Sequence, residues 1–112
     1  MLKIEAIIRP DKLDEVKEAL DAKGHHSMTV YDVEGRGRQK GIQLEWRVGT
    51  YTVEFLPKIK IEIIATESMV DNIVSAIVKA ARTGQVGDGK IFVSPVDDVI
   101  RVRTEESGED AI

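Results

Sequence analysis

The chain has 112 residues, of which 42% are hydrophobic and 32% are charged, with a formal net charge of −4 and a pI of about 5.2. This length and composition predict one globular domain over residues 1–112 with a modest core, and the acidic balance argues against a general nucleic-acid binder. The sequence has no cysteine, no basic-then-apolar leader pattern and no apolar run of membrane-spanning length, so we expect a cytoplasmic protein without disulfides or thiolate chemistry.

The first third of the chain predicts a strand, a helix and a second strand. Hydrophobic residues alternate from Lys3 to Arg9, which is the pattern of a strand with one apolar face. Pro10 interrupts that strand, and we expect Asp11 to cap a helix that ends at Gly24. The helix would carry one apolar stripe, made of Leu13, Val16 and Leu20. A further strand is predicted from about Ser27 to Glu34.

The segment from about residue 36 to 54 lacks a clear period. It opens with the basic, glycine-rich run Gly35-Arg-Gly-Arg-Gln-Lys-Gly41, which is either a phosphate-seeking loop base or a solvated basic loop. Thr50 to Phe55 can form one limb of a hairpin. Long connections inside a compact domain are usually functional or disordered, so we predict a projecting, mobile loop. Trp46 and Tyr51 are interpreted as contacts for a partner, or Tyr51 as a modification site.

The second half repeats the order of the first. Lys58 to Ala65 alternates as a strand, and a helix capped by Thr66 or Ser68 follows. Its stripe is the strongest in the chain and comprises Val70, Ile73, Val74, Ile77, Val78 and Ala81. A strand is expected at Ile91–Val93, then the apolar-basic segment Val99–Arg103, and finally an acidic, frayed tail over about residues 105–112.

Two strand-helix-strand units separated by a long loop predict an α+β protein, the ferredoxin-like βαββαβ sandwich. Right-handed crossovers place both helices on one face of the sheet. The other face, with Ile7, Ile64 and Phe92, is left uncovered, and an exposed apolar face usually meets a partner. Self-association is the simplest way to cover it.

A glycine-rich stretch, Thr83 to Val93, is the strongest functional feature of the sequence. Gly84, Gly87 and Gly89 lie within six residues and precede Lys90. Glycines that accept positive φ can aim successive N–H groups into one concavity, which suits phosphate oxygens. The match to the ATPase phosphate loop fails, because Ile91 offers no hydroxyl and a strand rather than a helix follows. The alternative is a plain connector in which Gly84 ends the helix.

Two other pairs of side chains, both cationic or titratable, could take part in binding. Arg101 and Arg103, two apart on a predicted strand, can hold phosphate oxygens or pair with surface carboxylates. His25 and His26 are interpreted as a solvated turn rather than metal ligands. No nucleophile-base arrangement stands out, which disfavours a small ferredoxin-like enzyme that handles nucleotides or phosphates. An RNA-recognition module is disfavoured because the expected central strands carry no aromatic residue.

The sequence is similar to the PII family of nitrogen-signalling proteins over almost its whole length. The most specific match is Thr83-x-x-x-Gly87-Asp88-Gly89-Lys90-Ile91-Phe92-Val93. Further matches are Ile7-Ile8-Arg9-Pro10, Gly35-x-Gly37-Arg38-Gln39-Lys40-Gly41, Phe55-Leu56-Pro57-Lys58 and Ile100-Arg101-Val102-Arg103-Thr104.

The resemblance implies a non-enzymatic homotrimeric sensor of nitrogen and energy status, with ATP or ADP in each cleft between subunits. The implied nucleotide-binding residues are Ile7, Thr29, Gly35, Gly37, Arg38, Gln39, Lys40, Glu62, Ile64, Gly87, Asp88, Gly89, Lys90 and Phe92, with Arg101 and Arg103 from the neighbouring subunit. The implied 2-oxoglutarate ligands are Gln39, Lys40, Gly41, Lys58 and Gly87. Gln39 would also bind the Mg²⁺ that bridges ATP and the acid.

The implied partner is an ammonium transporter or a nitrogen-metabolism enzyme, reached through Arg47 and Tyr51 of the loop, with membrane contact only through a transporter. The family's loop pattern around a modified tyrosine is Tyr-Lys/Arg-Gly-Ala/Ser-Ala/Glu-Tyr. Here the corresponding run is Trp46-Arg47-Val48-Gly49-Thr50-Tyr51. Arg47 and Tyr51 are kept while their neighbours differ, which leaves modification of Tyr51 open.

Overall fold

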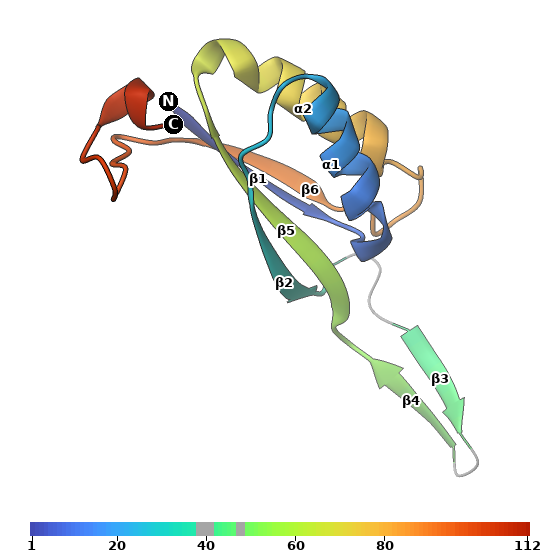
Figure 1. Ribbon diagram of the computed structural model, residues 1–112. Helices are drawn as coiled ribbons and strands as arrows, with labels where there is room; N and C mark the ends of the chain where they lie inside the picture. Colours follow the sequence, from blue (N-terminus) through green and yellow to red (C-terminus); the bar gives the residue numbers. More distant parts are fainter. Residues whose placement is uncertain (38–41, 47–48) are drawn as a thin grey trace.

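The computed structural model describes residues 1–37, 42–46 and 49–112 (Figure 1). The main sheet consists of β1 (Leu2–Ile8), β2 (Thr29–Gly35), β5 (Leu56–Ala65) and β6 (Lys90–Pro95). Two helices accompany it, α1 (Leu13–Ala22) and α2 (Glu67–Ala81). The remaining elements are a hairpin of β3 (Ile42–Trp46) and β4 (Gly49–Val53) and the 3-10 turns Pro10–Lys12 and Gly108–Ala111.

The sheet has the order β2-β5-β1-β6, and every neighbouring pair is antiparallel. Counted along the chain without the hairpin, this order is second, third, first, fourth, which is that of the predicted ferredoxin-like sandwich. The α+β prediction of a four-stranded antiparallel sheet with two helices is therefore confirmed. The central strands are β1 and β5, as expected, and neither contains an aromatic residue.

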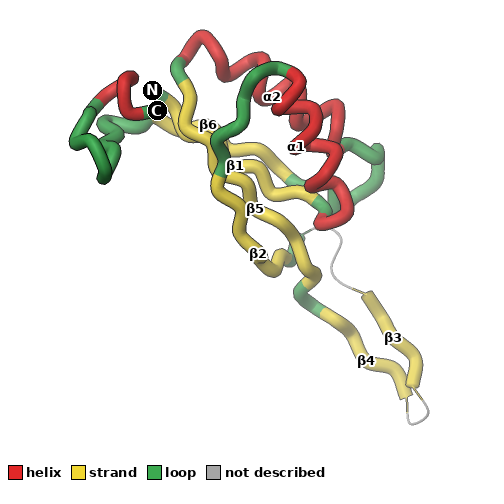
Figure 2. The backbone as a smooth tube through the Cα atoms, in the orientation of Figure 1, coloured by secondary structure: helices red, strands yellow, loops and turns green. Residues whose placement is uncertain are grey.

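Both helices cover the same face of the sheet (Figure 2). The alternation predicted for β5 puts Ile59, Ile61, Ile63 and Ala65 into the core, and β1 contributes Ile4, Ala6 and Ile8. The helices meet these strands with Val16 and Leu20 of α1 and with Val70, Ile73, Ala76, Ile77 and Ala81 of α2. Each fully buried branched side chain contributes about 1.5–3 kcal/mol of hydrophobic stabilisation.

The ends of the helices correct two predictions. Asp11 does not cap α1, because the fixed φ of Pro10 already opens a 3-10 turn and puts Asp11 inside it. Gly24 does end α1, with a φ of 81° and its N–H on the Asp21 carbonyl. Gly84 does not end α2, since the extended backbone of Arg82 stops that helix at Ala81.

At the start of α2, the predicted cap residue has the predicted position but not the predicted hydrogen bond. Thr66 occupies the N-cap position, but its side chain makes no capping hydrogen bond. Its hydroxyl lies 3.2 Å from that of Ser68 instead.

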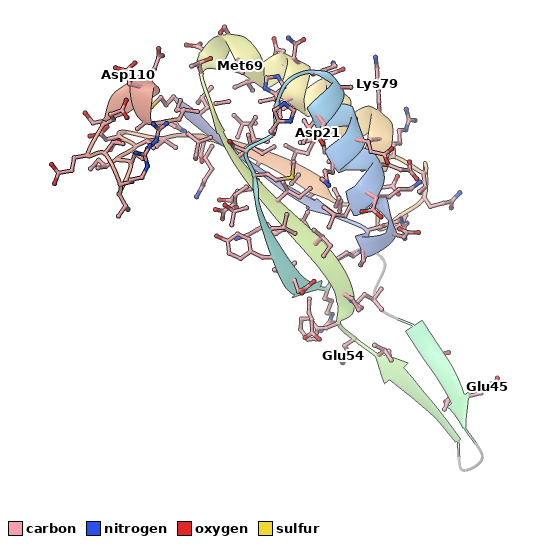
Figure 3. The ribbon with its side chains drawn as sticks, in the orientation of Figure 1. Asp21, Glu45, Glu54, Met69, Lys79 and Asp110 are labelled. Atoms are coloured by element: carbon pink, nitrogen blue, oxygen red, sulfur yellow. The ribbon has the colours of Figure 1, made fainter. Side chains whose placement is uncertain are left out.

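The loop predicted over residues 36–54 contains an antiparallel hairpin, β3 paired with β4, from Ile42 opposite Val53 to Trp46 opposite Gly49. It extends away from the main sheet (Figure 1). Figure 3 shows Glu54 at its base and Glu45 near its outer end. The limb predicted from Thr50 to Phe55 overlaps β4, whereas the strand β3 was not predicted. The alternating residues of β3, Ile42-Gln-Leu-Glu-Trp46, are a strand pattern that the surrounding glycines and charges obscured.

Two predictions for the C-terminal segment are also wrong. Arg101 and Arg103 do not lie on a strand: Ile100 makes a single bridge to Ser107, and the chain from Val102 to Thr104 is a turn. The acidic tail is not frayed, because the Gly108 N–H bonds the Val99 carbonyl at 3.0 Å and a 3-10 turn follows. The turn returns the chain onto itself, so its polar backbone groups find partners locally.

The sheet face away from the helices is mixed rather than apolar. Ile7, Ile64 and Phe92 lie on it, as predicted from the alternation, but charged residues lie between them. Two ion pairs are formed there, Lys3 with Glu5 at 2.8 Å and Lys60 with Glu62 at 3.2 Å. The Lys60 ammonium also lies 4.7 Å from the centre of the Tyr31 ring. A partner for this face would therefore need to match charge as well as shape.

Neither α1 nor α2 is long and apolar enough to cross a membrane, and the same holds for every helix among the described residues.

Candidate anion-binding site

A cavity of about 440 Å³ opens where the hairpin joins the sheet, within the range of small-molecule sites. Five segments line it: the end of β1, the end of β2, the start of β5, the glycine loop between α2 and β6, and the start of β6. The lining residues are Ile7, Gly35, Arg36, Gly37, Leu56, Lys58, Gln85, Val86, Gly87, Asp88, Gly89, Lys90 and Phe92.

The glycine loop, residues 83–89, has the backbone that the sequence predicts. Gly84, Gly87 and Gly89 have φ of 89°, 103° and 103°, a region that other residues adopt only with strain. At Gly89 a Cβ would also lie 1.7 Å from the carbonyl oxygen of Ile7. The loop can therefore approach the end of β1 this closely only with glycine at position 89.

The Asp88 side chain accepts several hydrogen bonds that fix the shape of this loop. Its carboxylate accepts hydrogen bonds from the N–H groups of Thr83 and Gly84, each at 2.9 Å, and from the Thr83 hydroxyl. The Arg9 guanidinium donates to the same carboxylate at 3.1 Å. The Thr83 hydroxyl, the two N–H groups and Arg9 together hold the pKa of the Asp88 carboxyl well below its usual range.

Positive charge gathers around the cavity. The Lys58 ammonium donates to the Gly87 carbonyl at 2.7 Å. Burial and the nearby charge of Arg9 lower the pKa of Lys58, and Asp88 partly offsets this. Lys90 and Arg36 complete the cationic lining, and Arg36 lies 3.9 Å from the Glu54 carboxylate. A concavity with glycine N–H donors and three cations has the chemistry to hold phosphate or carboxylate oxygens.

The structure brings together nine of the residues that sequence reasoning assigned to ligands. They are Ile7, Gly35, Gly37, Lys58, Gly87, Asp88, Gly89, Lys90 and Phe92. Arg38, Gln39, Lys40, Gly41 and Arg47 lie outside the described residues. The backbone of Tyr51 is placed in β4 of the hairpin.

Three other predicted ligands do not line the cavity. Thr29 and Glu62 are paired across β2 and β5, and Ile64 lies opposite Lys3. Glu62 is bonded there by the Tyr31 hydroxyl at 3.3 Å. All three residues lie on the sheet face away from the helices.

Arg101 and Arg103 follow the far end of β6, where Pro95 pairs with Leu2, so one chain does not bring them to the cavity. Asp110 of the same segment lies at the opposite end of the molecule from Glu45 of the hairpin (Figure 3). Arg101 is instead bonded by Glu106 at 3.1 Å. That these arginines serve a neighbouring subunit's site stays a prediction.

Sequence reasoning missed Arg9 as part of the site, as well as the lining residues Leu56, Gln85 and Val86, whereas Arg36 belongs to the basic run considered for phosphate. A signal for Arg9 was present: it is a cation directly after a strand, and Asp88 is the only carboxylate within the glycine stretch. The His26 ring nitrogen Nδ1 lies 2.8 Å from the Asp21 carboxylate, and no cluster of three or more potential metal ligands occurs among the described residues.

Comparison with known proteins gives one family. Residues 1–106 match the family model described as Nitrogen regulatory protein P-II. A protein of that name from Synechocystis sp. is 59% identical over 112 residues, with full coverage of both chains. Another from Cereibacter sphaeroides is 57% identical, again with full coverage of both. Nitrogen regulatory protein P-II 2 of Methanothermobacter thermautotrophicus is 56% identical over 100% of this chain and 97% of its own.

Proposed function

The chain belongs to the nitrogen regulatory protein P-II family, and we propose that it senses ATP or ADP together with 2-oxoglutarate and passes this signal to a partner protein. Members of this family are signalling regulators of other proteins rather than enzymes. The nucleotide, the acid and the partner are the proposed part.

The observation that carries the proposal is the cavity at the glycine loop. Gly87 and Gly89 have positive φ, so this loop can turn successive N–H groups toward one anion. Lys58 and Lys90 on its rim neutralise added negative charge. Phosphates are the ligand class that combines this charge with several acceptor oxygens, and Ile7 and Phe92 offer apolar surface for the rest of a nucleotide.

A 2-oxo acid fits the same site as a second ligand. Lys58 would meet its far carboxylate, and Gln39 would bind the Mg²⁺ held by the ATP phosphates. A metal held in this way would offer chelation to the keto and adjacent carboxylate oxygens of the acid. The acid should then depend on the nucleotide, and by linkage each ligand tightens the other by the same factor.

We further propose a homotrimer. No helix or strand among the described residues covers the sheet face with Ile7, Ile64 and Phe92, although this face carries ion pairs. A neighbouring copy that brought Arg101 and Arg103 to the cavity would also complete the phosphate site, which these arginines cannot reach within their own chain. Light scattering at micromolar concentration is expected to give the mass of three chains, and a monomer mass would contradict this.

The hairpin is the proposed contact for an ammonium transporter or a nitrogen-metabolism enzyme. Its extension away from the sheet separates a partner-facing end from the end beside the cavity (Figure 1). Arg47→Ala should weaken capture of the transporter and leave nucleotide affinity nearly unchanged. Loss of ATP binding in this variant would show that the two ends do not have separate roles.

Calorimetry with ATP, ADP and 2-oxoglutarate, singly and together, tests the ligands. We expect binding of either nucleotide, binding of 2-oxoglutarate only with MgATP, and little support from ADP, which lacks the γ-phosphate. Absence of nucleotide binding at millimolar concentration would overturn the proposal, and tight 2-oxoglutarate binding without nucleotide would overturn the coupling.

A further inference from the structure

We propose that Asp88 is a positioning residue: its carboxylate holds the glycine loop in the anion-binding shape, with Thr83 and Arg9, and contacts neither the phosphates nor their metal ion. The inference rests on the proposed nucleotide site. It assigns the Asp88 side chain a different role from Gly87 and Gly89 on either side of it, whose backbone N–H groups are the proposed donors to the ligand.

The hydrogen bonds of Asp88 leave it no capacity for a ligand. Oδ2 accepts the N–H groups of Thr83 and Gly84, each at 2.9 Å. Oδ1 accepts the Thr83 hydroxyl and, at 3.1 Å, Arg9 Nε. An ionised carboxylate has about four acceptor positions, two on each oxygen, so these contacts occupy all of them. The side chain is also largely covered, with 23% of its surface exposed.

Arg9 connects this arrangement to the sheet. One nitrogen of its guanidinium bonds Asp88, and another donates to the carbonyl of Val86 at 2.8 Å. Arg9 directly follows β1, so its backbone is fixed by the sheet. Two nitrogens of one planar guanidinium therefore bond two points of the loop, the Asp88 carboxylate and the Val86 carbonyl. Lysine, with a single nitrogen, could not reproduce this fixed fork.

These contacts also set the direction of the loop's N–H groups. In a trans peptide the C=O and N–H bonds point to opposite sides. Arg9 holds the Val86 carbonyl and Lys58 holds the Gly87 carbonyl. The N–H groups of Gly87 and Asp88 are consequently turned away from those two cations, as donors for an anion. Asp88 thus acts on the ligand through its backbone and through the loop shape, not through its charge.

Removal of the Asp88 charge should change nucleotide affinity in a different direction or under different conditions for each possible role of the carboxylate. A carboxylate in direct contact with phosphate repels it, so Asp88→Asn would tighten nucleotide binding if such contact existed. A carboxylate that binds Mg²⁺ would weaken binding on substitution only when the metal is present. A positioning carboxylate weakens binding with and without metal, because the amide offers one acceptor oxygen in place of two.

The experiment measures ADP binding to the full chain by calorimetry, in Mg²⁺ and in EDTA. Asp88→Asn is expected to weaken ADP about 10-fold or more in both conditions, as a 1.4 kcal/mol change would. Asp21→Asn makes the same charge change at the surface pair with His26 and should leave the affinity unchanged. Tighter binding by Asp88→Asn, or weakening confined to Mg²⁺, would overturn the proposal.

A second pair of variants guards against a general folding defect. Thr83→Val removes the hydroxyl that bonds Asp88 and should weaken ADP severalfold, whereas Thr83→Ser keeps the hydroxyl and should behave as the original chain. Hydrogen exchange of residues 84–90 without ligand should speed up in Asp88→Asn and Thr83→Val, and not in Thr83→Ser. Unchanged hydrogen exchange in these variants would refute the positioning role of Asp88, whether or not the chain binds nucleotide. Failure of the original chain to bind nucleotide would instead count against the proposed function.

Discussion

The ammonium of Lys58 lies 2.7 Å from the carbonyl oxygen of Gly87, and this bond joins the start of β5 to the glycine loop. The residue expected to select the acid ligand is therefore also a support of the phosphate-binding loop. Because an ammonium has three N–H donors, Lys58 can donate to a ligand carboxylate while it keeps its bond to the Gly87 carbonyl. This relationship connects the two proposed ligands within one chain, through a single side chain.

Substitution of Lys58 tests that double role. Lys58→Met should reduce 2-oxoglutarate affinity in the presence of MgATP about 10- to 100-fold, because a charged hydrogen bond contributes about 1.5–3 kcal/mol. MgATP alone should weaken by only about fivefold, since one loop hydrogen bond of about 1 kcal/mol is lost. Calorimetry measures both affinities. Lys23→Met, which alters a lysine beside α2 at 3.5 Å from the Asn72 carbonyl, is the matched control. Unaltered 2-oxoglutarate affinity in Lys58→Met would contradict the assignment.

The close approach of Gly89 to β1 predicts a strong effect on stability. Gly89→Ala combines positive φ with a methyl group 1.7 Å from the Ile7 carbonyl oxygen, so β1 or the loop must move. We expect a loss of more than about 2 kcal/mol in the free energy of unfolding. Gly84→Ala has a similar φ of 89° but no atom within 4 Å, and should cost only about 1 kcal/mol. Urea unfolding compares the two variants, and equal losses would show that the contact with Ile7 is unimportant.

Gly84 and Gly89 also show how much of the site could be predicted from the sequence. The three glycines and Lys90 predicted an anion cradle because glycine permits positive φ, and the structure has that backbone. Whether a given glycine is required by φ alone, as at Gly84, or also by a close neighbour, as at Gly89, depends on which strand passes beside it. That neighbour is Ile7, more than eighty residues earlier, and no local pattern points to it.

The fold was predictable where the hydrophobic periodicity of a segment agreed with the glycine, proline and capping residues at its ends. The alternation of β5 and the stripe of α2 are regular, and both elements lie where predicted. The prediction for the C-terminal segment was wrong because Arg101 and Arg103 flank a valine as in a strand, yet no strand of the described part of the chain pairs with them. Glu105, at a φ of 62°, and the Arg101–Glu106 pair instead produce a turn. A strand pattern needs a partner strand, and the sequence alone does not say whether one exists.

Acid should weaken the glycine loop through Asp88. Hydrogen bonds from the Thr83 hydroxyl, then from the N–H groups of Thr83 and Gly84 and from Arg9, hold the pKa of Asp88 below its unfolded value. The stabilisation is therefore complete above the unfolded pKa of about 4 and is lost as the pH falls toward the folded value. Urea unfolding between pH 7 and 3 should show a gap between the original chain and Asp88→Asn that narrows with acid. A gap independent of pH would mean that ionised Asp88 is not the stabilising form.

Glu106 should limit the contribution of Arg101 to ligand binding. The guanidinium bonds Glu106 at 3.1 Å and the Ile112 carbonyl at 3.4 Å, so a phosphate from a neighbouring subunit must displace an existing partner. The pair is more than a third exposed, and such pairs contribute about 0–1 kcal/mol. Glu106→Gln should accordingly tighten MgATP up to about fivefold at low salt, with the gain lost at high salt because screening weakens the pair. Glu105→Gln makes the same charge change one residue earlier and should have little effect. Equal tightening in both variants would indicate a general charge effect, and no tightening in either would show that Arg101 does not reach the nucleotide.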